Sequence, residues 1–244
     1  MPETALAVYD VTAGYVPDLP ILRDVSIRAQ RGSVTVIIGP NGAGKSTLIK
    51  AVAGVVPVAQ GQIKQSGQDI TNIRPDQMAS HGIAYVPQSD NIFRNLTIGQ
   101  NLDLALRRNN RDAPTRRAEL LEQFPVLAEK LREKASALSG GQRQFLAVAM
   151  ALAMRPTLIL MDEPSAGLAP KAAAEVLEMA QGLTANGTTI LLVEQNVNQA
   201  LGFADHCYIL AEGRNQVDGK AADLLGDKVI VDIYLGGKRM RAGA

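Results

Sequence analysis

The 244-residue sequence predicts an α/β fold with a mostly parallel sheet at its core. Three short runs, Val34–Ile38, Leu158–Met161 and Thr189–Val193, are apolar almost throughout, as strands are when helices cover both faces of their sheet. A turn and a helical pattern follow each run, and this alternation is typical of α/β proteins. The stretch Asn95–Lys134 is different, because it is rich in Arg, Leu and Glu and lacks a strand pattern. We therefore expect an α-helical subdomain, about residues 89–150, inserted into the core.

The other elements are expected near the two ends of the chain and between these runs. Val8–Val11 and Val25–Ala29 alternate as half-buried strands do, and they predict an N-terminal antiparallel β subdomain. Ile83–Val86 predicts one more strand, and Gly54 predicts the end of a helix. The segment Arg214–Gly237 predicts a small strand–helix appendage.

A charged segment lies within the expected insertion. The arginines of Arg107–Arg117, interrupted by Pro114, predict a solvated loop between two helices. Contact with another protein is the alternative interpretation of these charges.

Composition favours a soluble, cytoplasmic protein. The apolar content of 46% and the charged content of 20% are ordinary for a globular domain. A net charge of +1 gives no bias toward nucleic acid or an anionic membrane, and the first residues do not read as a secretory signal. The single cysteine, Cys207, excludes an internal disulfide and is expected to pack as a small apolar side chain.

Neither a membrane span nor a metal cluster is expected. The longest dense apolar run, near Phe145–Met154, is shorter than the roughly 20 residues that a membrane-spanning helix needs. If the protein serves transport, another polypeptide must therefore supply the path through the membrane. His81 and His206 lack neighbours at metal-ligand spacing.

A phosphate-binding motif follows the first apolar run. The pattern G-x-x-x-x-G-K-[ST] is matched after a strand and at the start of a helix, the context in which it forms a phosphate loop. Backbone N–H groups and the positive end of the helix dipole favour anions there, so ATP is the expected ligand. Within the motif, Lys45 is expected to reach the β- and γ-phosphates and Ser46 to bind Mg²⁺. The predicted ATP-binding residues of this segment are Gly39, Pro40, Asn41, Gly42, Ala43, Gly44, Lys45, Ser46 and Thr47.

Two carboxylates end the second apolar run. In phosphate-loop enzymes an Asp at a strand end holds Mg²⁺, so Asp162 is the predicted metal ligand. The adjacent Glu163 is placed to orient and deprotonate an attacking water. Beside a phosphate loop, the pair therefore predicts ATP hydrolysis with a phosphate-loop NTPase core.

The sequence Leu-Ser-Gly-Gly-Gln at 138–142 narrows the prediction. Ser139 can cap the helix that follows, and the two glycines allow close approach of the backbone. With the phosphate loop and the strand 158–163, this motif resembles the ATP-binding-cassette (ABC) family along nearly the whole chain, as one domain over 6–237. The resemblance implies that Ser139, Gly140, Gly141 and Gln142 face the γ-phosphate bound by a second ATP-binding subunit, in a head-to-tail dimer that is either homo- or heteromeric.

Two further positions match the family's pattern, and two others depart from it. The resemblance implies that Tyr15 stacks on adenine and that Gln88 senses Mg²⁺ and water and touches the membrane subunit. Gln195 stands where the family usually has a switch histidine, and Ala169 where it usually has Asp. A glutamine can donate a hydrogen bond to the γ-phosphate but carries no positive charge.

These departures are also the mark of a subfamily. The sequences GLAP (167–170), VEQNVNQAL (193–201) and YLGG (234–237) resemble the second ATP-binding subunit of branched-chain amino acid importers, although that subfamily often has Glu at position 88. This implies a peripheral subunit on the inner face of the membrane. Its partners would be integral permease subunits and, indirectly, a periplasmic or extracellular solute-binding protein, without nucleic acid. A non-transport ABC ATPase and a weakly active nucleotide-binding partner remain the alternatives.

Overall fold

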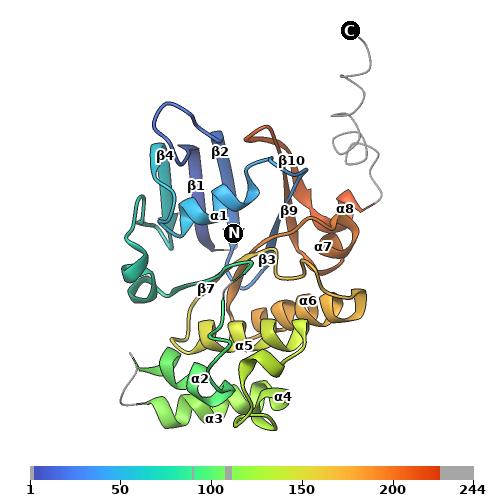
Figure 1. Ribbon diagram of the computed structural model, residues 1–244. Coiled ribbons are helices and arrows are strands. Elements are labelled where there is room, and N and C mark those ends of the chain that lie inside the picture. Colours follow the sequence, from blue (N-terminus) through green and yellow to red (C-terminus); the bar gives the residue numbers. More distant parts are fainter. Residues whose placement is uncertain (1–2, 90, 108–111, 226–244) are drawn as a thin grey trace.

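The computed structural model describes residues 3–89, 91–107 and 112–225, and its two sheets and surrounding helices appear in Figure 1. The first sheet is antiparallel, with the order β2-β1-β4-β5. Its strands are β1 (Thr4–Ala13), β2 (Leu22–Gln30), β4 (Val58–Gln65) and β5 (Gln68–Asp69). The predicted N-terminal antiparallel subdomain is therefore confirmed.

The second sheet has six strands in the order β10-β9-β3-β8-β7-β6. Five of them run parallel, and β10 pairs antiparallel with β9 at one edge. Its strands are β3 (Val34–Ile38), β6 (Ile83–Val86), β7 (Leu158–Asp162), β8 (Thr189–Val193), β9 (His206–Ala211) and β10 (Arg214–Lys220). The mostly parallel core sheet is confirmed, and the register pairs Asp162 at the end of β7 with Val193 at the end of β8.

Helices and the first sheet bury both faces of this second sheet. On β3, Val36 and Ile38 belong to one apolar cluster, shared with helices of the second half of the chain. Ile37 lies in the other cluster, with Leu48 of α1 and Val8 of the antiparallel sheet. Because neighbouring residues on a strand point to opposite faces, a strand covered on both sides must be apolar at every position, as observed. The helices are α1 (Lys45–Val52), α2 (Ile98–Leu106), α3 (Ala113–Gln123), α4 (Pro125–Ala128), α5 (Gly140–Leu152), α6 (Pro170–Thr184), α7 (Val197–Phe203) and α8 (Ala221–Leu224), with short 3₁₀ turns at Pro75–His81 and Ala135–Ala137.

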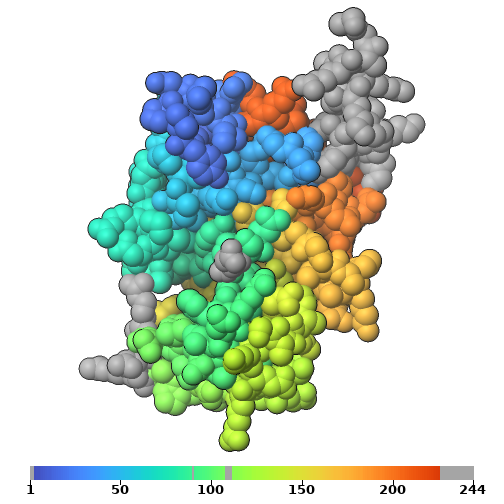
Figure 2. Space-filling view, viewed as in Figure 1, coloured from blue at the N-terminus to red at the C-terminus, as the bar shows by residue number. Residues whose placement is uncertain are grey.

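The N-terminal strands lie side by side with the hairpin between β9 and β10, although about 190 residues separate them in sequence. Figure 2 shows the surface of the N-terminal strands (blue) against that of the hairpin near residue 213 (orange-red). There the amide of Arg23 donates to the carbonyl of Gly213, with 2.8 Å between N and O. The predicted appendage from Arg214 onward is therefore wrong in one respect, because β10 completes the core sheet. Residues beyond 225, including the YLGG sequence, lie outside the described residues.

The inserted helices hold one further correction. Arg116 and Arg117 were predicted in a solvated loop, but both lie on α3, which begins at Ala113. Pro114 stands in the first turn, where its missing N–H removes no helical hydrogen bond, so it starts the helix instead of breaking it. Arg116 is 8% exposed, and its guanidinium donates to the carbonyl of Leu152 at the end of α5, with a shortest N–O distance of 2.6 Å.

Gly54 follows the C-cap residue of α1, Ala53, so the predicted end of this helix is confirmed. Its φ of +68° is left-handed, and a Cβ at this position would lie 1.8 Å from the carbonyl oxygen of Ile73.

Gly54→Ala is therefore expected to lower the free energy of unfolding by about 1–3 kcal/mol or more, measured by denaturant unfolding. Gly182→Ala, inside α6 with open space around it, is the matched control and should raise stability by about 0.5–1 kcal/mol. An unchanged unfolding midpoint for Gly54→Ala would contradict the strained geometry.

Candidate functional site

The phosphate loop connects β3 to α1 at the carboxyl end of the core sheet. Gly42 and Gly44 have φ of +82° and +97°, and Gly44 stands at the N-cap of α1. These left-handed conformations suit glycine, and they turn the backbone around an open hollow. The hollow measures about 300 Å³, and residues of three segments line it: Ile21, Asn41, Gly42, Ala43, Gly44, Lys45, Ser46, Thr47 and Glu163. Gly39 stands closer to the sheet, where a Cβ would lie 2.1 Å from the carbonyl oxygen of Leu210.

Lys45 lies folded against the loop that it belongs to. Its side chain is 5% exposed, and its Nζ donates to the carbonyls of Gly39 and Pro40, at 2.9 and 3.2 Å. Burial lowers the pKa of Lys45, and the nearby carboxylates of Glu163 and Asp162 partly oppose this effect. Two carbonyl oxygens of the loop thus accept hydrogen bonds from the ammonium group of Lys45.

The two predicted metal ligands of this region touch each other. The Oγ of Ser46, in the first turn of α1, donates to Oδ1 of Asp162 at 2.9 Å. The hydroxyl of Tyr85 on β6 donates to Oδ2 of the same carboxylate at 3.4 Å. Burial, with the negative charge of Asp162 as a second cause, raises the pKa of Tyr85 above its usual range. These oxygen atoms are of the kind that Mg²⁺ prefers.

Glu163 is held by two amide side chains from different loops. Its carboxylate Oε2 accepts a hydrogen bond from Nε2 of Gln88, at 3.0 Å, and a second, shorter one from Nε2 of Gln195. The residue is 5% exposed, has a left-handed φ of +49°, and its N–H donates to the carbonyl of Val193 at 2.9 Å. Because β6, β7 and β8 are parallel neighbours, the loops that follow them meet at one edge of the sheet. The structure thus brings together three residues that the sequence predicted separately.

The remaining predicted residues do not line this hollow. Ser139 is the N-cap of α5, and it forms a capping box with Gln142, with N–O distances of 3.3 and 3.1 Å. A Cβ on Gly140 would lie 2.6 Å from the side chain of Leu168, so the start of α5 packs closely against the loop after Glu163. Tyr15 is 54% exposed, on the loop between β1 and β2. Tyr15 and the residues at the start of α5 are therefore not among those that line the hollow of the phosphate loop.

Sequence reasoning missed Tyr85 and Glu194. Tyr85 lies within the predicted strand Ile83–Val86, where nothing in the local pattern distinguishes its hydroxyl. Glu194 follows the apolar strand β8 directly, and a carboxylate at the end of an apolar run is the same signal that singled out Asp162 and Glu163 at the end of β7. Applying that signal to every core strand would have found it.

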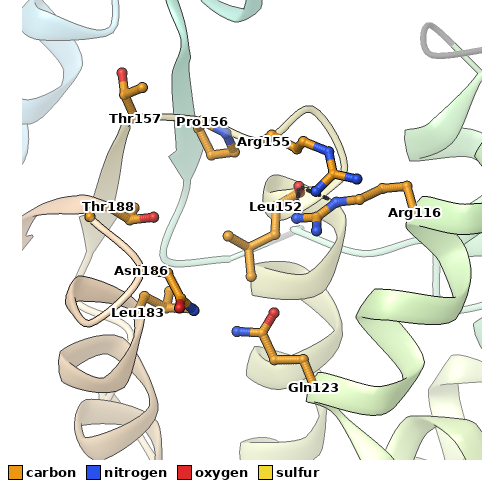
Figure 3. Close-up of a pocket in the computed structure, with 10 residues that line it drawn as sticks. Arg116, Gln123, Leu152, Arg155, Pro156, Thr157, Leu183, Asn186 and Thr188 are labelled. Atoms are coloured by element: carbon orange, nitrogen blue, oxygen red, sulfur yellow. Dashed lines mark hydrogen bonds between the residues drawn. The ribbon is translucent and has the colours of Figure 1, made fainter. Parts of the chain in front are cut away.

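A second cavity, of about 350 Å³, lies at the other end of the sheet (Figure 3). Arg116 and Arg155 reach its wall, and Gln123 and Asn186 extend into it from opposite sides. Both guanidinium groups pair with Glu119, at 2.7 and 2.8 Å, and these contacts hold the pKa of Glu119 down at about 2. Arg155 also pairs with Asp112, at 3.2 Å, so two carboxylates balance the two guanidinium groups, and these ion pairs join α3 to the segment that follows α5.

The described residues show neither a membrane span nor a metal cluster. Over 3–89, 91–107 and 112–225, every helix is too short or too polar to cross a membrane. In the same ranges, His, Cys, Asp and Glu side chains do not gather in groups of three that could hold a metal ion. Cys207 is fully buried, as expected for a small apolar side chain.

Comparison with known proteins identifies the family of this chain and several of its relatives. The family model described as ABC transporter matches residues 22–166. The chain is 40% identical over 233 residues to the probable branched-chain amino acid transport ATP-binding protein LivF of Archaeoglobus fulgidus, covering 95% of this chain and 98% of that one. It is 37% identical over 230 residues to the high-affinity branched-chain amino acid transport ATP-binding protein BraG of Pseudomonas aeruginosa, covering 94% and 99%.

Relatives with a different transport role and solved structures also match. The lipopolysaccharide export system ATP-binding protein LptB of Escherichia coli is 35% identical over 221 residues, covering 88% of this chain and 91% of that one. The crystal structure of the ADP conformation of an ATP-binding cassette of an ABC transporter superposes with a TM-score of 0.85 and 29% identity, covering 96% and 99%. On the family match, the relatives and the fold, the chain belongs to the ABC transporter family and is an ATP-binding, ATP-hydrolysing subunit of such a transporter.

Proposed function

We propose that this chain hydrolyses ATP to drive an importer of branched-chain or other hydrophobic amino acids. LivF and BraG are named for branched-chain amino acid transport, and they match this chain over nearly its whole length. The sequences GLAP and VEQNVNQAL support the same assignment. In this proposal the subunit lies on the cytoplasmic face of the membrane, attached to integral permease subunits, with a solute-binding protein as an indirect partner.

Nucleotide phosphates are proposed to bind in the hollow of the phosphate loop. The ammonium of Lys45 would leave the carbonyls of Gly39 and Pro40 and donate to the β- and γ-phosphates. This exchange is favourable because phosphate oxygens carry negative charge and carbonyl oxygens only a partial one. Tyr15, which is 54% exposed, offers its ring to adenine.

The oxygen donors beside the loop fit Mg²⁺. Ser46 and Asp162 already lie 2.9 Å apart, and the amide oxygen of Gln88 lies on the neighbouring loop. When bound there, Mg²⁺ would neutralise charge on the β- and γ-phosphate oxygens. These three side chains are the proposed ligands, directly or through water.

The arrangement around Glu163 is the observation that carries the proposed hydrolysis of ATP. Its carboxylate is the proposed general base, and it lines the hollow beside the phosphate loop. Gln88 and Gln195 fix one of its oxygens, which leaves the other free to accept a proton from water. Gln195 would then donate a hydrogen bond to the γ-phosphate, the role proposed for histidine in the wider family.

A second protomer is needed to complete the site. Ser139, Gly140, Gly141 and Gln142 open α5, and a helix N-terminus favours an anion. They do not line the hollow of the chain's own phosphate loop, which supports the proposal that they cover ATP bound by a partner subunit, head to tail. ATP would then hold two protomers together until hydrolysis removes the bridging phosphate. The domain is proposed to span 6–237, with the helical insertion near 89–150 facing the permease.

Uptake measurements test the proposed substrate. A strain lacking the gene for this chain is expected to lose most high-affinity uptake of radiolabelled leucine, because the permease cannot cycle without its ATPase. Expression of the wild-type chain should restore uptake, and expression of Glu163→Gln should not. Uptake of lysine is the control for general damage, since its charged side chain does not fit a hydrophobic binding site.

Lipopolysaccharide export is the second candidate, favoured by the 35% identity to LptB. Normal leucine uptake together with an outer-membrane defect in the same strain would favour it over import. A non-transport ATPase would leave both unchanged, and the chain would then fail to sediment with membranes.

A further inference from the structure

Glu194 is a buried carboxylate to which the proposed mechanism gives no role. It follows β8 directly, is 2% exposed, and its own N–H donates to the carbonyl of Ile37 on β3 at 3.1 Å. Burial raises the pKa of Glu194. A carboxyl group in such a place costs free energy unless hydrogen-bond donors face it, so its partners indicate what the residue does.

Those partners belong to the two segments that hold the proposed base. Oε1 of Glu194 accepts the backbone N–H of Ser165, at 3.0 Å, and Oε2 accepts that of Gln195, at 3.3 Å. Ser165 stands two residues after Glu163, and the side chain of Gln195 donates to Glu163. One carboxyl group therefore connects the loop after β7 with the loop after β8.

The loop after β7 needs such an external anchor. Glu163 has a left-handed φ of +49°, a conformation that costs a residue other than glycine of order 1 kcal/mol or more and persists only when neighbouring contacts enforce it. Farther along, Ala169 stands at the N-cap of α6 and supplies no side-chain hydrogen bond to the helix. The hydrogen bond from Ser165 to Glu194 thus lies between a strained residue and a helix start without a side-chain cap.

We propose that Glu194 is a positioning residue for hydrolysis. It fixes the backbone of Ser165, and so holds the carboxylate of Glu163 where it meets the attacking water and the amide of Gln195. This inference rests on the proposed role of Glu163 as the base. A shift of about 1 Å in a catalytic group can cost about 10²-fold in rate. The hydrogen bonds of Glu194 should therefore affect the turnover rate more than the affinity for the nucleotide.

Steady-state ATPase kinetics of the purified 244-residue chain test the proposal. Glu194→Ala is expected to lower kcat by about 10–10²-fold with little change in the KM for ATP, because binding groups remain in place. Glu194→Gln keeps one oxygen that can accept the Ser165 N–H, so it should retain most of the parental kcat. Glu194→Asp keeps the carboxyl group but withdraws it by one methylene, and this variant should resemble Glu194→Ala.

Asp205→Ala is the control for losing a carboxylate that accepts a backbone N–H away from the phosphate loop. The carboxylate of Asp205 also accepts a backbone N–H, that of Val34 at 2.8 Å, but at the opposite end of β3 from the phosphate loop. Asp205→Ala should lower the midpoint of thermal unfolding and leave kcat unchanged. A parental kcat for Glu194→Ala, or a loss no larger than in Asp205→Ala, would overturn the proposal.

Two further comparisons keep the result decisive. If Glu194→Ala does not fold, low kcat in Glu194→Asp with retained kcat in Glu194→Gln supports positioning, and equal values in the two refute it. Glu163→Gln belongs in the same series. If Glu163→Gln hydrolyses ATP at the parental rate, the proposed base is wrong, whatever the Glu194 variants show.

Discussion

Glu163→Gln is expected to bind ATP but to hydrolyse it about 10²–10⁴-fold more slowly than the parent, because the change removes the group that accepts the proton from water. Glutamine has the same shape, so one oxygen can still accept a hydrogen bond from Gln88 or Gln195. The fold and the nucleotide site should therefore remain intact.

The same variant should accumulate as a closed dimer in the presence of Mg·ATP. Hydrolysis is the step proposed to release the two protomers, and blocking it leaves the bridging phosphate in place. Phosphate release measures the first effect, and size-exclusion chromatography with light scattering measures the second. Glu178→Gln, an exposed change on α6, is the matched control and should behave as the parent. Hydrolysis by Glu163→Gln at the parental rate would remove Glu163 from the mechanism.

Lys45→Ala is expected to weaken ATP binding by about 10–10²-fold, because charge-assisted hydrogen bonds contribute about 1.5–3 kcal/mol. The loss should be larger for ATP than for ADP, since the ammonium is proposed to reach the γ-phosphate as well as the β-phosphate. The variant also removes the hydrogen bonds from Nζ to the carbonyls of Gly39 and Pro40, which loosens the phosphate loop.

Isothermal titration with ATP and with ADP measures both parts of this prediction. Lys50→Ala changes the other lysine of α1, in its last turn, and should leave both affinities unchanged. Equal ATP affinity in Lys45→Ala and the parent would show that this lysine does not contact the nucleotide. An equal loss for both nucleotides would restrict its contact to the phosphates that they share.

Much of the fold was predictable because its signals are local. Val34–Ile38, Ile83–Val86 and Thr189–Val193 were predicted with the bounds that the structure gives. Each is a short apolar run next to a turn, and burial on both faces demands that pattern whatever the partner strand. The phosphate loop was predictable for a similar reason, since its glycines, lysine and hydroxyl all lie within nine consecutive residues.

Interactions between distant segments were not predictable in this way. Arg116 looked solvated because charge is usually exposed, and only the end of α5 shows which carbonyl it meets. The segment from Arg214 looked like an appendage because the sequence of a strand does not show which other strand it pairs with in the sheet. In both places the partner lies far along the chain, where local patterns carry no information.

The sequence by itself determined three features of this chain: a phosphate loop, a carboxylate pair at the end of a buried strand, and a family-specific start of a helix. Each could be identified because it consists of consecutive residues. Only the tertiary structure decided that Gln88 and Gln195 both hold Glu163, and that Glu194 joins the loops on which they depend. The physical reason is the parallel sheet. It brings the ends of β6, β7 and β8 to one edge, although about 75 residues separate the first end from the second.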